Sequence, residues 1–194
     1  MSTIIIKEIN SLSHSSCSIP RLVNKEPQNH KAKLFQISNI QIISELLLNI
    51  CEENKQKIEN AIKKKIQIPK NISKNSLRNF IIKLAKHVKI HDSTMIITLI
   101  YIDRMCNNNN ITITYNNIFQ LVLTSLLIAI KYNEEKNFSF KYFASLGGIT
   151  ASELKILEKK FLYLINYNLY VDQRSFEKYN EDINSLDEEN GEKE

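Results

Sequence analysis

The stretch "TLIYIDRM", residues 98 to 105, places an acid and a base side by side in a run that is otherwise almost wholly apolar. On a helix of about 3.6 residues per turn, Asp103 falls near the centre of an apolar face. That face consists of Met95, Ile96, Leu99, Ile100 and Ile102. A carboxylate buried there is costly unless a cation or several hydrogen-bond donors meet it. We therefore predict that Asp103 is buried and has a partner elsewhere in the chain.

The helix that carries this stretch is expected to lie inside a bundle of helices. It starts at a cap formed by Asp92 or Ser93, ends in the four asparagines 107–110, and is apolar on nearly all sides. Residues 118–131 predict a second helix of the same kind. A helix that is apolar all round has neighbours on several sides. These two helices therefore require others around them.

The spacing of apolar residues predicts those surrounding helices. One begins near Ile37, a second starts after Ser73 or Asn75, and a short one spans about residues 139–146. Thr150 and Glu153 form a T-x-x-E capping box, which opens a further helix. The sequence thus predicts an all-α fold, with five helices from about 75 to 168 and an additional N-terminal helix before them.

Composition divides the chain into four segments. Residues 1–35 mix Ser, Asn, His, Pro and Lys without lasting periodicity, and we interpret them as a flexible arm. An N-terminal helical segment follows at 36–69, and the main bundle at 73–179. The acidic residues 180–194 contain few apolar side chains and are expected to form a mobile tail. Only "NITITYN", residues 110–116, alternates like a strand, and we expect an extended connection there.

The cysteines and histidines lack the spacing of a metal site. The three cysteines, at positions 17, 51 and 106, form no CxxC pair, which argues for a reducing compartment and against structural zinc or a disulfide framework. His87 and His91 are four residues apart, but no HExxH and no nearby ligand set completes a site. The sequence also contains no Gly-rich phosphate loop or nucleophile elbow. We expect no metal, no cofactor and no catalytic residue.

Charge and hydropathy restrict the class of partner. The net charge of +5 and the pI of about 9.0 raise nucleic acid as a partner. The densest basic cluster, "AIKKKIQIPK" at 61–70, has no interleaved aromatic residues, and we interpret it as a solvated helix end. The most apolar stretch, 118–130, is interrupted by polar residues and is shorter than the roughly 20 residues of a membrane span. We expect no membrane association and a location in the nucleus, the cytoplasm or both.

Three segments in order resemble one known family. They are "LIYIDRM", "YNNIFQLVLTSLLIAIKY" and "YFASLGGITASELKILEKKFLYLINYNLYV". Their order and separation resemble the cyclin box of the single-box P/U-type cyclins, the group related to phosphate-regulating cyclins. The resemblance covers about residues 76 to 179 and implies that the main bundle is a five-helix cyclin box. It further implies a regulatory subunit that binds and activates a cyclin-dependent protein kinase and is not itself an enzyme.

The resemblance implies a partner for Asp103. In cyclins the aspartate of this motif is met by an arginine on the first box helix. Arg78 in "NSLRNF" occupies the comparable place, and Lys83 is a second candidate. Asp103 and Arg78 would then form a structural ion pair that fixes how the first two box helices cross.

The resemblance also implies a kinase-binding surface. Cyclins contact the regulatory helix of the kinase with a lysine at the end of the third box helix and a glutamate on the fifth, which Lys131 and Glu158 match. The apolar contacts around them would be Ile128, Tyr132, Leu162, Tyr167 and Leu169. The residues alone leave a second interpretation open, in which Lys131 favours the helix dipole and Glu158 is a surface charge. Tyr132, Leu162 and Tyr167 are equally compatible with the core.

Two features depart from the cell-cycle cyclins, and one alternative function remains. "LRNFI", residues 77–81, lacks the Met-Arg-Ala-Ile-Leu pattern of the cyclin docking patch, and the chain has no tryptophan. We also expect no full second box after Tyr179, which fits the single-box group. The alternative is a nucleic-acid-associated transcription module, because the general transcription factor of the TFIIB type uses a cyclin-like fold and this chain is basic.

Overall fold

The computed structural model describes residues 37–61, 74–109, 111–135 and 138–191, and these residues form seven α-helices. The helices are α2 (Ile37–Ala61), α3 (Lys74–Val88), α4 (Asp92–Asn109), α5 (Ile118–Asn133), α6 (Phe140–Leu146), α7 (Ala151–Leu164) and α8 (Gln173–Gly191). The predicted all-α fold is confirmed: α3 to α7 are the five expected helices, and α2 precedes them. None of the described helices is long and apolar enough to cross a membrane.

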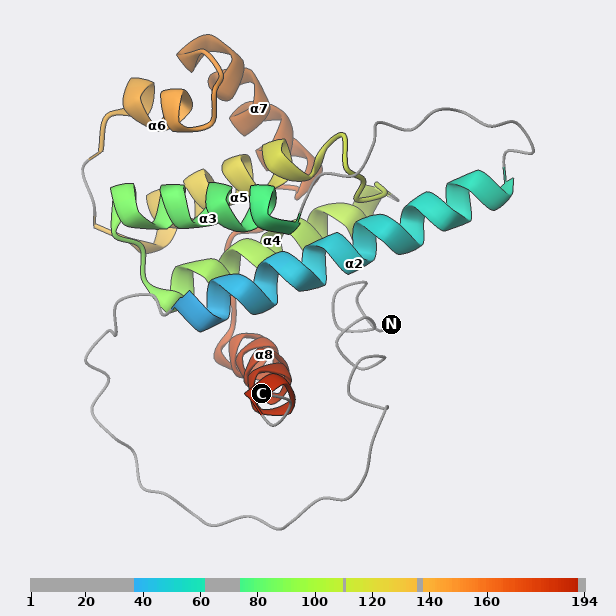
Figure 1. Cartoon of the computed structure of the whole chain (residues 1–194). Helices are drawn as coiled ribbons and strands as arrows, with labels where there is room; N and C mark the ends of the chain where they lie inside the picture. Colours follow the sequence, from blue (N-terminus) through green and yellow to red (C-terminus); the bar gives the residue numbers. More distant parts are fainter. Residues whose placement is uncertain (1–36, 62–73, 110, 136–137, 192–194) are drawn as a thin grey trace, which may run out of the picture.

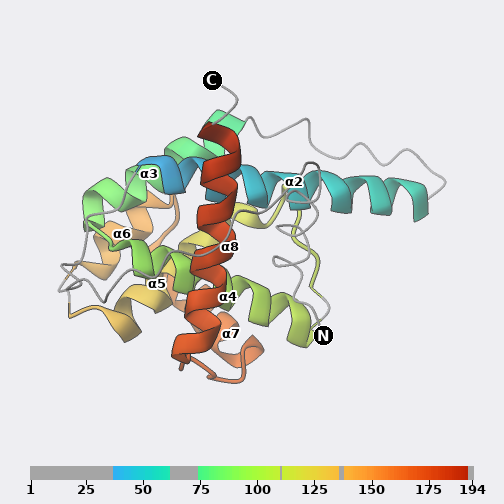
Figure 2. The same cartoon turned by 90° about the horizontal axis from the view of Figure 1, so that it is seen from below.

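Helices α4 and α5 form the centre of the bundle. They pack against each other, α2 packs on α3, and α7 packs on both α5 and α4. Figure 1 shows α6 and α7 on one side of the molecule and α8 at the opposite side. In Figure 2 the long axis of α8 runs across α4, and contacts with α2 and α4 hold it there. The central pair of helices is therefore covered on two opposite sides.

Burial explains why α4 and α5 lie in the centre. Twelve residues of α4 and ten of α5 are buried, on all sides of each helix, as their sequences predict. Two free cysteines, Cys51 of α2 and Cys106 of α4, belong to this core. Burial raises the pKa of each thiol to about 12, so few thiolates form near neutral pH. Both cysteines therefore act as packing residues.

The chain between α4 and α5 connects them without forming a sheet. Residues 111–114 form neither a helix nor a strand. The Tyr115 hydroxyl donates to Glu52 at 2.9 Å, and Asn54 Nδ2 donates to the Ile113 carbonyl at 2.9 Å. Both Glu52 and Asn54 belong to α2. The connection is therefore held against the N-terminal helix by side-chain hydrogen bonds.

Local caps place α6 and α7. The Ser139 side chain accepts from the Tyr142 amide and opens α6. The predicted capping box is present at α7, where Thr150 and Glu153 each accept a bond from the other's amide. Between these helices, a Cβ on Gly147 would overlap the Leu123 side chain of α5. A glycine at this position therefore allows the end of α6 to approach α5 closely.

The C-terminal part of the chain differs from the mobile tail predicted for 180–194. The described residues up to 191 continue α8, which begins at Gln173. Tyr179 and Ile183 are buried in the core, and Phe176 packs against it. These three residues recur at helical spacing, so a narrow apolar stripe anchors a helix that is otherwise polar. The predicted arm at 1–35 and the basic cluster at Lys63 to Lys65 lie outside the described residues.

Candidate partner-binding surface

Asp103 is buried as predicted, with 1% of its surface exposed. It accepts a hydrogen bond from the hydroxyl of Tyr179, a residue of α8. A hydrogen bond to a charged acceptor offsets part of the cost of burying the carboxylate. The acid in the middle of α4 therefore links the central helix to the C-terminal one.

The predicted ion pair between Asp103 and Arg78 is not found. The salt bridges among the described residues do not join these two side chains. Arg78 Nε is buried and has no hydrogen-bond partner in the part of the chain that the structure describes. The second candidate, Lys83, donates instead to the Leu146 carbonyl at the end of α6, at 3.1 Å. Instead of Arg78, the partner of Asp103 is Tyr179, because α8 packs on α4 and places the Tyr179 hydroxyl at the Asp103 carboxylate.

The structure brings Lys131 and Glu158 together. Lys131 Nζ lies 2.5 Å from Glu158 Oε1, and this salt bridge joins the end of α5 to the middle of α7. The Lys131 side chain is 49% exposed and that of Glu158 is 13% exposed. Lys131 Nζ also lies 5.7 Å from the centre of the Phe140 ring, within the range of a cation–π contact. A partly exposed ammonium group is thus held in a fixed place at the surface.

The five predicted apolar neighbours of this pair divide into three groups. Tyr132 and Tyr167 are exposed, while Leu162 and Leu169 are partly buried. Ile128, in contrast to the prediction that it lies at a contact surface, is only 3% exposed and belongs to the core. Ile128 lies in the part of α5 that is buried on all sides, whereas Lys131 lies in the last turn, where the helix reaches the surface. We call Lys131, Tyr132, Glu158, Leu162, Tyr167 and Leu169 the Lys131–Glu158 surface.

Side chains of α4 hold the segment that follows α7. The Tyr101 hydroxyl donates to the Leu169 carbonyl at 2.7 Å. Arg104 Nη1 donates to the carbonyls of Asn168 and Tyr170, both at 2.9 Å. Burial raises the pKa of Tyr101, which keeps its hydroxyl protonated as a donor. This role was not predicted from the sequence, although Tyr101 and Arg104 lie within two residues of Asp103 in a largely apolar helix.

The backbone turns sharply in the same segment. Asn166 and Tyr167 have φ angles of 53° and 54°, in the left-handed region that favours glycine. Such a conformation in a residue other than glycine costs on the order of 1 kcal/mol or more. The Tyr167 amide donates to the Leu162 carbonyl at 2.9 Å and closes the end of α7. The turn leaves the Tyr167 ring exposed at the surface.

The two candidate metal-binding histidines have other contacts. His87 Nδ1 is hydrogen-bonded to the Tyr142 hydroxyl at 2.8 Å. The backbone amide of His91 donates to Glu134 at 3.2 Å. Within the described ranges, no three His, Cys, Asp or Glu side chains gather as a metal site.

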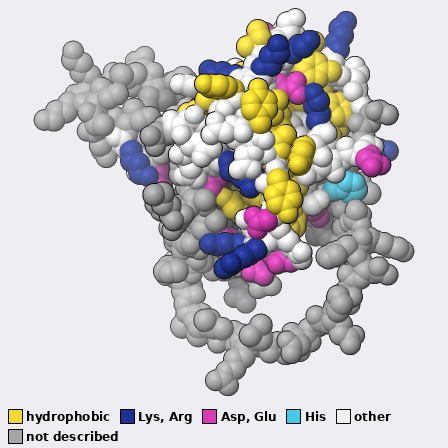
Figure 3. Space-filling model, turned by 180° about the vertical axis from the view of Figure 1, so that it is seen from behind, with side chains coloured by type: hydrophobic (Ala, Val, Ile, Leu, Met, Phe, Trp, Pro, Cys, Tyr) yellow, Lys and Arg dark blue, Asp and Glu magenta, His cyan; other side chains and the backbone are white. Residues whose placement is uncertain are grey.

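Large apolar side chains are exposed at several places on the fold. Figure 3 shows hydrophobic side chains gathered in a band over one face, with Lys and Arg among them. The exposed large apolar residues include Tyr132 and Tyr142, and, on and after α7, Ile156, Tyr163, Tyr167 and Tyr170. Apolar area of this kind, surrounded by charged groups, is typical of a surface that binds another protein.

Comparison with known proteins identifies a family and several relatives. A family model described as Cyclin matches residues 24–169. Cyclin-U2-1 of Arabidopsis thaliana is 33% identical over 105 residues, which are 54% of this chain and 47% of that protein. Cyclin-P2-1 of Oryza sativa subsp. japonica is 31% identical over 104 residues, which are 54% of this chain and 48% of that protein. The chain thus spans about half the length of the curated relatives it matches.

Proposed function

The chain belongs to the cyclin family, and on that premise we propose that it is a regulatory subunit that binds and activates a cyclin-dependent protein kinase. Its similarity to plant U- and P-type cyclins favours this role over the nucleic-acid alternative. The observation that carries the proposal is the Lys131–Glu158 salt bridge at the surface, next to exposed tyrosines. The kinase would bind the Lys131–Glu158 surface.

The charges and rings of this surface suit a protein partner. The ammonium group of Lys131 is partly exposed beside Glu158 and can donate a further hydrogen bond, so a charged group of the partner can approach the pair. Tyr132 and Tyr167 supply large apolar faces with polar ends, which are common at the centre of interfaces. If the Lys131–Glu158 salt bridge loses its water on binding, the affinity for the partner depends strongly on the sign and position of these two charges.

The surface is also formed before a partner binds. Lys131 is held by Glu158 and by the Phe140 ring, and Tyr101 and Arg104 hold the backbone near Tyr167. Association costs less when the contacting groups are already ordered. The hydrogen bonds of α4 therefore support the proposed binding without contacting the kinase.

In this proposal the chain contributes no catalytic group. As the family resemblance implies, activation would consist of holding the kinase's glutamate-bearing helix inward, so that its lysine–glutamate pair aligns the ATP phosphates. This is a shift between two states of the kinase, and its size is set by how much better the chain binds the active state.

Charge exchange between Lys131 and Glu158 tests the proposal. A tagged full chain would be purified from its own cells, the associated kinase identified by mass spectrometry, and binding measured by calorimetry with the purified kinase. Lys131→Glu and Glu158→Lys should each weaken binding by at least about 2 kcal/mol, roughly thirtyfold. The double variant restores the salt bridge within the chain but reverses its direction, and it should bind as weakly as the single variants.

Two controls complete the experiment. Lys86→Glu changes an exposed lysine of α3 in the same way and should leave the affinity unchanged. Thermal melts should show that each variant folds. If both single variants fold and bind as the wild type does, the surface is wrongly assigned. Recovery of binding in the double variant would show that the pair is only structural.

A further inference from the structure

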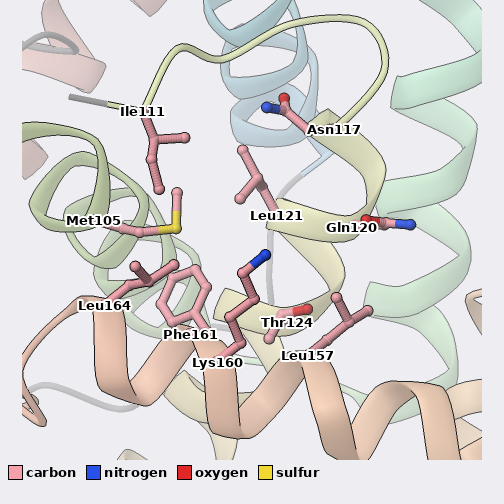
Figure 4. Close-up of a pocket in the computed structure, with 10 residues that line it drawn as sticks. All are labelled: Met105, Ile111, Asn117, Gln120, Leu121, Thr124, Leu157, Lys160, Phe161 and Leu164. Carbon is pink, nitrogen blue, oxygen red and sulfur yellow. The ribbon is translucent and has the colours of Figure 1, made fainter. Parts of the chain in front are cut away.

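A pocket of about 160 Å³ opens between α4, α5 and α7, beside the connection that follows α4. Figure 4 shows the side chains that line it. They are Met105, Ile111, Asn117, Gln120, Leu121, Thr124, Leu157, Lys160, Phe161 and Leu164. Most of these side chains are apolar. A cavity of about 150 Å³ with similar walls holds a benzene ring, so this pocket has room for one aromatic side chain.

Lys160 is the only charged residue among those that line the pocket, and no carboxylate accompanies it. In Figure 4 its side chain extends from α7 toward the other labelled residues. The Thr124 hydroxyl is buried and has no hydrogen-bond partner within the described residues. A pocket of this composition favours an apolar group with an acidic group close to it.

The exposed surface continues from the pocket along the outside of α7. Ile156 and Tyr163 lie four residues before and three residues after Lys160, so all three share one side of the helix. Ile156 and Tyr163 are exposed, and the neighbouring Lys155 and Lys159 are exposed as well. We call these five residues the α7 outer face. Ile156 and Lys160 each lie about 160° from Glu158 around the helix, whereas Lys155 lies about 60° from it, so the two surfaces are separate at the pocket and adjoin at Lys155.

We propose that the pocket and the α7 outer face together bind an acidic segment of a partner protein, which inserts one aromatic side chain into the pocket. The inserted ring fills the apolar cavity, and acidic residues beside it pair with Lys160 and its neighbouring lysines. The rest of the segment covers Ile156 and Tyr163. This arrangement matches a common form of peptide recognition, in which one buried anchor gives affinity and the charges around it give selectivity.

The extent of the exposed apolar surface favours a peptide over a small molecule. A ligand the size of the pocket would leave Ile156 and Tyr163 in water, because both side chains lie outside the lining of the pocket. A segment of several residues covers both regions. The proposal does not depend on the identity of the kinase, because Lys160 and Glu158 lie on opposite sides of α7.

Selection of peptides against the full chain tests this proposal. A phage-displayed library of random 12-residue peptides would be selected on the immobilised protein, and an enriched peptide labelled with fluorescein for anisotropy. We expect enriched peptides to contain an aromatic residue among aspartates or glutamates. Lys160→Glu removes the cation, and Gln120→Trp places a bulky ring at the exposed mouth of the pocket. Each should weaken binding by about tenfold or more.

The control is Lys86→Glu, an equal charge change on α3, which should bind the peptide as the wild type does. Lys160→Glu should leave kinase binding unchanged, which separates this proposal from the proposed function. Three results would overturn it: no enriched peptide, enriched peptides without acidic residues, or unchanged binding by both variants. A dimer in sedimentation experiments that Lys160→Glu dissociates would also overturn it, since the face would then join two copies.

Discussion

At the scale of single residues, Asp103 shows how a buried charge can be satisfied from outside its own motif. Its carboxylate accepts from Tyr179, which lies on α8 and far along the chain. Ile128 and Lys131 give a second case, because they are three residues apart on α5 and yet one is core and the other surface. In both cases the environment of a side chain follows from which helix packs over it.

The Tyr179 hydroxyl should contribute to stability. In Tyr179→Phe the ring can still fill its place, but the buried Asp103 loses a donor. We expect the free energy of unfolding to fall by about 1 to 3 kcal/mol, measured by urea denaturation. Tyr163→Phe is a matched control, because that ring is exposed, and it should change stability by less than about 0.5 kcal/mol. Equal stability of the two variants would contradict a structural role for the hydrogen bond.

At the scale of elements, α8 completes the bundle although its composition is that of a tail. Its contacts are with α2 and α4, and its apolar stripe is narrow. Helix α4 has apolar residues on all its sides, so one side would face water without α8. The need to cover α4 explains why a polar, acidic segment is held as a helix against the core.

Ile183 should be a main anchor of α8. It is 2% exposed, and Ile183→Ala leaves a cavity between α8 and the rest of the bundle. We expect a loss of about 2 to 4 kcal/mol in the free energy of unfolding, measured by chemical denaturation followed by circular dichroism. Ile156→Ala, at an exposed position of α7, makes the same chemical change and should cost less than about 0.5 kcal/mol. A similarly small effect at Ile183 would mean that α8 contributes little to stability.

At the scale of the whole molecule, two surfaces are carried on one helix. Glu158 faces Lys131 of α5, whereas Lys160 lines the pocket formed with α4 and α5. The first place holds a lysine paired with a glutamate, and the second holds Lys160 with no carboxylate among the residues that line the pocket. We therefore propose a kinase and an acidic segment as separate partners of the two sites.

The dependence of binding on salt should distinguish the kinase from nucleic acid. A partly apolar interface with few charged groups should lose less than about tenfold in affinity between about 50 and about 200 mM salt. Binding through six to ten phosphate contacts would lose roughly a thousandfold or more over that range. Calorimetry with the purified kinase, and anisotropy with a labelled duplex, measure the two dependences. A steep dependence for the duplex at micromolar affinity or better would favour the transcription-module alternative.

The sequence by itself determined the helices and their order. The periodic spacing of apolar residues located α3 to α7, and the pair of Thr150 and Glu153 located the start of α7. It also determined that Asp103 is buried. These are local properties, because helix formation, capping and the direction of a side chain depend on residues within a few positions of one another.

The tertiary structure decided which side chains meet. Asp103 is hydrogen-bonded to Tyr179 and not paired with Arg78, and Ile128 lies in the core. The described part of the acidic C-terminal segment belongs to α8. The tertiary structure also brought Lys131 to Glu158, for which the residues alone had left a second interpretation open. The physical reason is that burial and pairing depend on how helices far apart in the sequence pack on one another. Local periodicity fixes the face that each helix buries, but it does not specify the helix that covers that face.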